Sequence, residues 1–299
     1  FFFFFQGDFM VTDQEYAQLS ARAYAATNPN KIALGDWTEL EWLPDRSYGF
    51  SVGVYTKGND IVISYAGTNE AADWGWANGL VSLGLPSPQV MEAMLLYITT
   101  KRDNPGANIT FTGHSLGGGL ASMMAVFFDR PATVFDHAPF ELGAVNLVTL
   151  GIYRAELIAL AFSDPSFDNY SPSVFSAREA QVRGIHLKGE ALEVGRAAGT
   201  EITGTALPPV DPGSPVGATA VNLHSMILLA SMMTSTAFAS AVRAQPGLIA
   251  LLLDGSLYKF NAKTSSDPDL LTLLYSKQVG SSTTPLLDRF AADLLRLTT

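Results

Sequence analysis

The sequence predicts an α/β fold in which helices cover both faces of a mostly parallel central sheet. Two observations predict it. Short β-branched and apolar runs alternate with helix-like segments along the chain, which is the pattern of β-α-β units. The chain also has 299 residues, of which 47% are hydrophobic and only 15% charged, and this composition excludes a disordered or fibrous protein. We expect one domain over residues 6–299. The five phenylalanines of residues 1–5 lack the features of a signal peptide, and we treat them as extraneous to the fold.

The N-terminal part predicts a helix followed by a hairpin. Thr12 and Glu15 have the spacing of a capping box, which opens a helix through about residue 26. Residues 48–55 alternate in polarity and lead into a Lys-Gly-Asn-Asp turn, and residues 61–65 form a β-branched run. These two runs and the turn between them are typical of a β-hairpin with a buried second strand.

The middle of the chain predicts a strand between two helices. Ser87 and Pro88 supply an N-cap and a first helical residue, and the helix ends before an Asn-Pro-Gly breaker at residues 104–106. Residues 108–112 then form a short apolar strand, and residues 116–128 form an apolar helix.

The C-terminal half predicts two more strands and then mostly helices. Residues 133–136 and 181–188 have the pattern of core strands, and residues 203–217, rich in proline and glycine, predict a long loop. The run 221–241 contains no charged residue and has the length of a membrane span. Because it carries eight polar side chains, we expect a buried helix there and no transmembrane segment.

Charge and cysteine content narrow the chemistry. The net charge of −10 argues against a nucleic-acid partner, which needs a lysine- and arginine-rich face. The absence of cysteine removes thiol nucleophiles and cysteine-bound metals. Serine, histidine and carboxylates must therefore carry any catalysis. An acidic, cysteine-free chain also suits secretion from a bacterium.

Residues 113–117 read Gly-His-Ser-Leu-Gly and fit the G-x-S-x-G nucleophile elbow. In that motif a strained turn between a strand and a helix exposes the serine hydroxyl above the sheet. The strand at 108–112 and the helix at 116–128 provide both flanks. The motif therefore predicts that Ser115 is a nucleophile in an α/β-hydrolase fold; a phosphate-binding helix start or a plain tight turn is the other interpretation.

Two blocks of sequence resemble the class 3 (fungal-type) lipases. The first is the elbow with the glycine that follows it, and the second is residues 63–68, Ile-Ser-Tyr-Ala-Gly-Thr, which is similar to the strand and R-G-T segment of that family. The resemblance covers roughly residues 52–126. Ala66 departs from it, because the family usually has arginine there. The resemblance implies a serine hydrolase with a helical lid or cap after Thr68.

A serine nucleophile needs a histidine base and a carboxylate that orients the base. The chain has four histidines. We interpret His114, beside the serine, and His137 and His186, near predicted strands, as structural residues. His224 follows the long loop, obeys the chain order serine, acid, histidine, and resembles the C-terminal histidine segment of the family. It is the candidate base, although a core histidine is the alternative.

Several carboxylates are candidates for the acid that orients the histidine. Glu190 is the first choice, because it follows the predicted strand 181–188 at the carboxyl edge of the sheet, where α/β active sites collect. The family more often has aspartate there. Asp211, in the loop that approaches the base, is the alternative, and Asp164 and Asp168 come third.

The oxyanion of the reaction needs backbone N–H donors. Leu116, the residue after the nucleophile, supplies one, and the resemblance implies that Thr68 supplies the other. Residues 69–86 carry Trp74 and Trp76 with few charges, which favours a lid that opens at a lipid surface, although ordinary core fits equally well. Residues 142–175 are a possible cap insertion.

These features predict a serine carboxylic-ester hydrolase, first of all a lipase that cleaves acylglycerol esters through an acyl-enzyme at a membrane or oil–water interface. A phospholipase A1 or a secreted lipolytic effector is the alternative within this class. A catalytically silent lipid-binding or interaction protein is the alternative outside it. No cofactor or metal motif occurs in the sequence, so we expect neither group.

Overall fold

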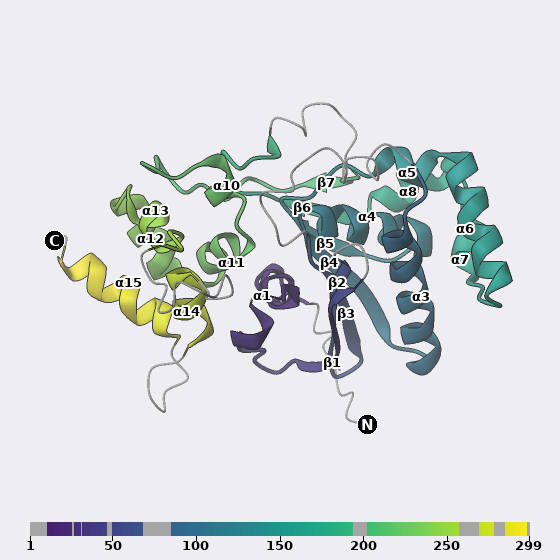
Figure 1. Ribbon diagram of the computed structural model, residues 1–299, viewed down its shortest axis with the longest axis horizontal. Helices are drawn as coiled ribbons and strands as arrows, with labels where there is room; N and C mark the ends of the chain where they lie inside the picture. The colour runs from purple at the N-terminus through teal and green to yellow at the C-terminus, as the bar shows by residue number, and fades with distance from the viewer. Residues whose placement is uncertain are drawn as a thin grey trace, which may run out of the picture.

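The α/β fold predicted from the sequence is present in the computed structural model, which describes residues 11–25, 27–30, 32–46, 50–67, 85–193, 202–256, 269–277 and 285–297 (Figure 1). Within these residues a seven-stranded sheet has the order β1-β2-β3-β4-β5-β6-β7. Its first three strands pair antiparallel, and β3 to β7 pair parallel. The strands are β1 Thr38–Arg46, β2 Phe50–Lys57, β3 Asp60–Tyr65, β4 Asn108–His114, β5 Ala132–Phe135, β6 Val182–Ile185 and β7 Thr205–Ala206.

Helices lie on both faces of the sheet (Figure 1). They are α1 Asp13–Ala23, α3 Pro88–Asp103, α4 Leu116–Phe128, α5 Glu141–Val145, α6 Leu147–Ala159, α7 Pro165–Asp168, α8 Phe175–Glu179, α10 Ala220–Leu223, α11 Met226–Thr234, α12 Thr236–Ala244, α13 Leu248–Leu252, α14 Leu270–Ser276 and α15 Leu286–Leu297. Single 3-10 turns occur at Asn28–Asn30 and Pro172–Val174. The helices α3 and α4 cover one face, and α1 and α11 cover the other.

The alternation of side chains along the strands divides the core into two clusters. In β3, Ile61 and Ile63 pack with α3 and α4, whereas Val62 between them packs with α1 and α11. This division follows from the two-residue period of a strand, and it explains why the central strands are apolar on both faces.

Strand β1 is absent from the sequence prediction. It lies at the edge of the sheet, and its pairing with β2 is interrupted by two register shifts. Glu39, Glu41 and Pro44 lie within it, and such residues are unfavourable in central strands but common at edges, where they prevent pairing with other chains. The hairpin of β2 and β3 was correctly predicted.

The capping box at the start of α1 was also correctly predicted. The Glu15 N–H donates to the Thr12 hydroxyl at 3.2 Å, and the Thr12 N–H donates to the Glu15 carboxylate at 2.9 Å. The helix ends at Ala23, three residues earlier than the pattern indicates. The residue after it, Tyr24, has extended backbone and turns toward the sheet.

The single buried helix expected over residues 221–241 is wrong. The segment forms α10, α11 and α12, and the axes of α11 and α12 differ by 113°. Ser235, between them, caps α12 by accepting the Phe238 N–H, so the polar residues of the run end and start helices. No single described helix has the length and hydropathy of a membrane span; the bent pair α11 and α12 meets those criteria only when the two are counted together.

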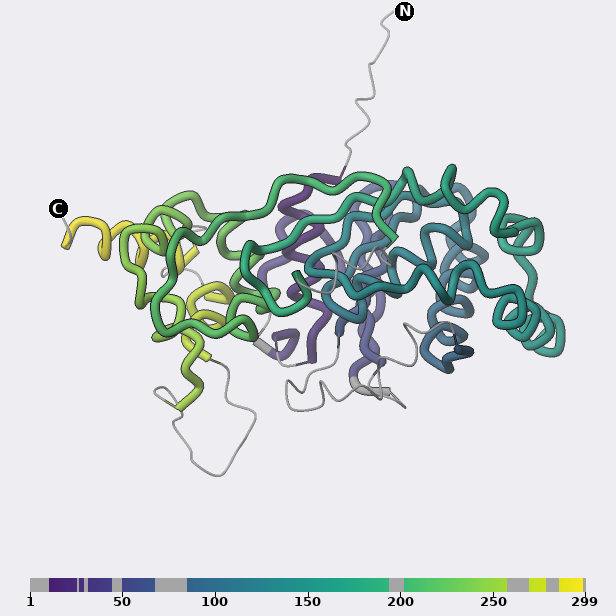
Figure 2. Tube along the Cα trace, turned by 90° about the horizontal axis from the view of Figure 1, so that it is seen from above, coloured from purple at the N-terminus to yellow at the C-terminus, as the bar shows by residue number. Residues whose placement is uncertain are grey.

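The two ends of the molecule are helical (Figure 2). At one end, the run expected to form a cap is divided at Asn146, whose side chain accepts two N–H groups at the start of α6. The inner face of α6 joins the core, and the Tyr153 hydroxyl accepts the Ser87 N–H at 2.9 Å. At the other end, α12 packs on α15.

Candidate active site

The turn between β4 and α4 has the geometry of a nucleophile elbow. Ser115 has φ 57° and ψ −128°, a conformation that residues other than glycine rarely adopt. Its hydroxyl makes no helix-capping hydrogen bond. Its N–H donates to Phe135 O at 3.0 Å, and its carbonyl accepts the Ala138 N–H at 2.9 Å. The end of β5 therefore holds the strained turn in place.

Glycines allow the tight packing around this turn. A Cβ at Gly117 would lie 2.3 Å from Tyr65 O, closer than any side chain can approach. A Cβ at Gly67, after β3, would lie 2.9 Å from the Ser115 Cβ. The end of β3 therefore passes directly beside the serine, and a larger residue at either position would push the helix or the strand away.

One of the two predicted oxyanion donors, Leu116, lies within the described residues. Leu116 is the first residue of α4, where an N–H has no partner within the helix. Thr68, Trp74 and Trp76 lie outside the described residues, as does most of the expected lid. Gly67, the residue before Thr68, is described and donates its N–H to the Tyr24 hydroxyl at 3.1 Å.

His224 and Glu190 form a buried pair. The His224 Nδ1–H donates to the Glu190 Oε2 at 2.5 Å, and each residue is less than a tenth exposed. His224 follows α10, whose Thr219 and Asn222 form a capping box. Glu190 lies in a turn after β6, where its carboxylate also accepts the Leu192 N–H at 2.7 Å. The acid is thus oriented by the backbone as well as by the histidine.

Burial lowers the pKa of His224 below its ordinary value of 6.5, and the hydrogen bond with Glu190 opposes that effect. Charge on His114 lowers the pKa further, whereas Asp136 raises it. The imidazole is therefore neutral at neutral pH, and the Nδ1–H bond to the carboxylate leaves Nε2 as the basic atom. A neutral, oriented imidazole of this kind can accept a proton from an alcohol.

The other carboxylates considered from the sequence have different partners. Asp211 is exposed, with its carboxylate 3.4 Å from Lys188 Nζ and accepting the Gly213 N–H. Asp164 caps α7 and contacts Lys101 at 2.6 Å, and Asp168 is exposed. Of the candidate acids, Glu190 is the one that the structure brings to His224.

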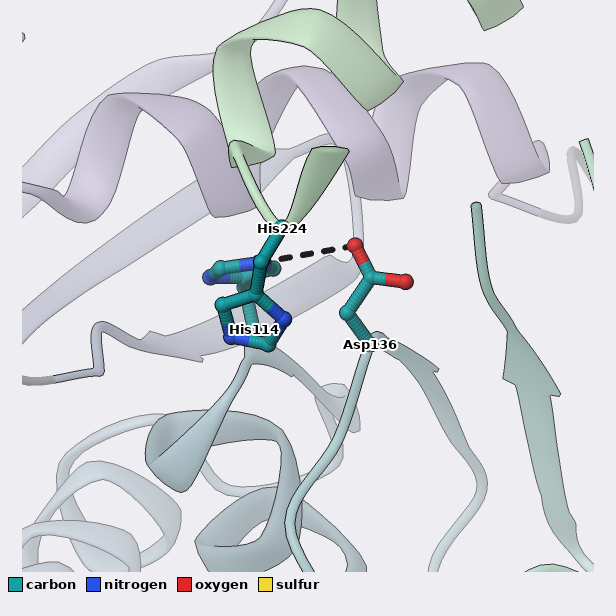
Figure 3. Close-up of side chains that lie close together, drawn as sticks. All are labelled: His114, Asp136 and His224. Carbon is teal, nitrogen blue, oxygen red and sulfur yellow. Dashed lines mark ion pairs between the residues drawn. The ribbon is translucent and has the colours of Figure 1, made fainter. Parts of the chain in front are cut away.

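A second pair of side chains, which the sequence pattern did not indicate, lies beside His224 (Figure 3). His114 and Asp136 are both buried, with the His114 Nε2 3.6 Å from the Asp136 Oδ2. The rings of His114 and His224 lie 4.6 Å apart. Asp136 directly follows β5, so the position that favours Glu190, the carboxyl end of a parallel strand, could have identified it too.

His114, Asp136 and His224 each offer one atom of a type that binds metals, and these atoms lie within 4.8 Å of one another. The opposite ring nitrogens of both histidines are held by protein groups, His224 by Glu190 and His114 by the Tyr24 hydroxyl. One Asp136 oxygen accepts the Leu187 N–H at 2.8 Å. We describe the three residues as a buried cluster that hydrogen bonds to Glu190, Tyr24 and Leu187 hold in place.

Comparison with known proteins identifies relatives over the first half of the chain. A family model described as a Tle-like phospholipase domain matches residues 10–149. The "Extracellular phospholipase A1" of Serratia liquefaciens is 33% identical over 137 residues, which cover 44% of this chain and 42% of that protein. The chain therefore spans less than half the length of this relative.

Several solved structures are also similar. The Rhizomucor miehei lipase propeptide complex has a TM-score of 0.38 and 16% identity, over 60% of this chain and 63% of that one. The lipase from Rhizopus microsporus var. chinensis has a TM-score of 0.37 and 13% identity, over 59% and 65% of the two chains. Over the part that carries β1 to β5 and the elbow, the sequence of this chain is therefore similar to the sequences of phospholipases.

Proposed function

We propose that the protein is a serine carboxylic-ester hydrolase that cleaves acyl esters of glycerophospholipids. The observation that carries the proposal is the placement of the His224–Glu190 pair beside the strained turn of Ser115, with the ring of His224 packed on the residue before the serine. The phospholipid as substrate is supported by the match to a phospholipase domain and by a phospholipase A1 relative. Acylglycerols, expected first from the sequence, are the competing substrate.

In the proposed mechanism His224 Nε2 takes the proton of the Ser115 hydroxyl while the oxygen attacks the ester carbonyl. Glu190 accepts the Nδ1–H and stabilises the imidazolium. The protonated His224 then gives its proton to the leaving alcohol, and the acyl group stays on Ser115. Water, deprotonated by the same histidine, releases the fatty acid and restores the serine.

The N–H groups of Leu116 and Thr68 are the proposed donors to the oxyanion. Removing one such donor costs on the order of 10² to 10³ in rate. Thr68→Ala keeps the backbone N–H and removes the side-chain hydroxyl as a second donor, and we expect it to leave a trace of ester hydrolysis that exceeds the activity of Ser115→Ala. Equal activity of Thr68→Ala and the wild-type protein would remove the Thr68 hydroxyl from the mechanism.

The setting follows from the same relatives. An extracellular relative and the acidic, cysteine-free composition support secretion from a bacterium. The substrate would then be met at a membrane or another lipid surface. Partition of the enzyme activity between medium and cells of the native host measures this directly.

A fluorophosphonate probe tests the catalytic class. We expect one probe per chain, on the peptide that contains Ser115, and none on Ser115→Ala. A folded wild-type protein that takes no probe would point to the silent lipid-binding alternative.

Substrate class is tested with mixed micelles of a phosphatidylcholine that carries different acyl chains at its two positions, and with a matched triacylglycerol. We expect faster release from the phospholipid, and the released chain identifies the position cleaved. Preference for triacylglycerol would replace the phospholipase proposal with the lipase one.

A further inference from the structure

We propose that Asp136 is a positioning residue of this site: together with His114 it fixes the turn that carries Glu190 and stabilises the positive charge that His224 acquires during acyl transfer. This inference rests on the proposed function for the role of His224. The contacts of Asp136 do not depend on whether the protein is an enzyme, so this inference and the proposed function can be tested separately.

Asp136 is built to face inward. Its side chain has no exposed surface, and its φ of 40° is unfavourable for an aspartate. Its N–H donates to Ile185 O at 2.9 Å, and its Oδ1 accepts the Leu187 N–H at 2.8 Å. Asp136 therefore joins the end of β5 to the segment that follows β6.

That segment carries the acid. Leu187 O accepts the Glu190 N–H at 3.2 Å, so the residue held by Asp136 in turn holds the backbone of Glu190. The turn closes at Gly189, whose φ is 84°. One oxygen of Asp136 thus determines where the acid of the His224–Glu190 pair lies.

The other oxygen of Asp136, Oδ2, faces His114, and the hydrogen bond of Tyr24 determines which ring nitrogen of neutral His114 carries the proton. Burial raises the pKa of the Tyr24 phenol well above its usual range, so Tyr24 keeps its proton. The Tyr24 oxygen accepts the Gly67 N–H, and its O–H faces the Nδ1 of His114. Donation to Nδ1 places the proton of neutral His114 on Nε2, which faces the Asp136 Oδ2 at 3.6 Å.

Among the described residues, Glu190, His114 and Asp136 face His224, and they come from the ends of β6, β4 and β5. A charge on His114 would lower the pKa of His224, so the proposal requires His114 to be neutral when His224 takes up its proton. Asp136 attracts the imidazolium of His224 from within 4.8 Å, in a buried environment where charges are poorly screened. The contribution of Asp136 to the pKa of His224 is accordingly upward.

Asp136→Asn is the decisive variant, because it removes the charge and keeps both the shape and an oxygen for the Leu187 N–H. The chain has only four histidines, so their ring signals can be followed by NMR in ¹⁵N-histidine-labelled protein. We expect the pKa of His224 to fall by about one pH unit in Asp136→Asn. The acidic limb of kcat/KM for a soluble ester should move down by the same amount, with kcat about tenfold lower.

Asp164→Asn is the matched control. It also removes a buried carboxylate, but one that caps α7 and contacts Lys101. We expect it to leave the titration of His224 and the pH profile as in the wild-type protein. An unchanged pKa of His224 in folded Asp136→Asn would overturn the proposal, even if activity fell, because the role would then be structural only.

The wild-type protein provides a second test that needs no variant. The ¹⁵N shifts should place the proton of His114 on Nε2 and that of neutral His224 on Nδ1; the opposite tautomer of His114 would contradict the argument. A chelator should leave both rings unchanged, and a shift on chelation would assign the cluster to a metal instead. If the wild-type protein cleaves no ester while these ring properties hold, the proposed function fails and the electrostatic inference stands.

Discussion

Two buried histidines meet at the carboxyl edge of the sheet, and each faces a carboxylate in a different way. His224 donates to Glu190 at 2.5 Å, a distance at which a hydrogen bond fixes the orientation and tautomer of the ring. His114 faces Asp136 at 3.6 Å, beyond an ordinary hydrogen bond but well within the range of electrostatic attraction. In the proposed mechanism the two carboxylates therefore have different roles: Glu190 orients the base, and Asp136 acts through its charge and through its hydrogen bond to the backbone.

The largest expected effect is the loss of either partner in the proton transfer. Ser115→Ala and His224→Ala should each lower kcat by about 10⁴ or more, and the double variant should be no worse than either, since the residues act as one unit. Single-turnover kinetics on a chromogenic ester measure all three. Additive losses would mean that His224 does not serve Ser115.

Removal of the oriented carboxylate comes next. Glu190→Gln should lower kcat by on the order of 10³, because the histidine loses both its tautomer lock and the charge opposite it. Asp211→Asn is the matched control on the alternative acid, and we expect its rate within about twofold of the wild-type rate, as for an exposed surface carboxylate. The reverse order of the two rates would reassign the acid.

The pH dependence sharpens the contrast between the two carboxylates. The base must be neutral, and burial lowers its pKa below the ordinary 6.5, so activity should persist at pH 6.5 and be lost only as the pH falls through the lower value. The measurement is kcat/KM for an uncharged ester from pH 4 to 9. A midpoint above 6.5 would show that attraction by the carboxylates outweighs burial.

The smallest expected effect concerns the backbone. Ser115 has φ 57°, whereas His224 has φ −81°, so strain is concentrated in the elbow. Relative to Ser115→Ala, Ser115→Gly should stabilise the protein by about 1 kcal/mol, because glycine adopts this conformation without steric cost. Urea unfolding of the two inactive variants tests it, and equal stabilities would mean that the turn is relaxed.

The sequence pattern predicted correctly those elements that depend on residues close together in the chain. The elbow, the capping box of Thr12 and the β2–β3 hairpin all depend on residues within a few positions of one another. The edge strand β1 was missed because its charged residues resemble a loop, and its pairing with β2 becomes evident only in the sheet. The run 221–241 was misjudged because hydropathy shows that a segment is buried, not where Ser235 ends one helix and starts another.

Chain order was enough to suggest the contact between His224 and Glu190 but too weak to establish it, because 34 residues and a long loop separate the two. Asp136 was overlooked for another reason. It was grouped with the strand before it, although a charged side chain after Val134 and Phe135 could not remain buried without partners. The partners are Leu187, which follows β6, and His114, at the end of β4.

The parallel order of β3 to β6 has a consequence for the evolution of this protein. Each of these adjacent strands delivers one group to the same edge: Gly67 from β3, Ser115 from β4, Asp136 from β5 and Glu190 from β6. Neighbouring strands are about 4.8 Å apart, so four ends span only about 15 Å. After each strand end, a separate connection leads the chain to the start of the next parallel strand. Insertions there can change the surroundings of the proposed active site, while the sheet keeps the spacing of Ser115, Asp136 and Glu190.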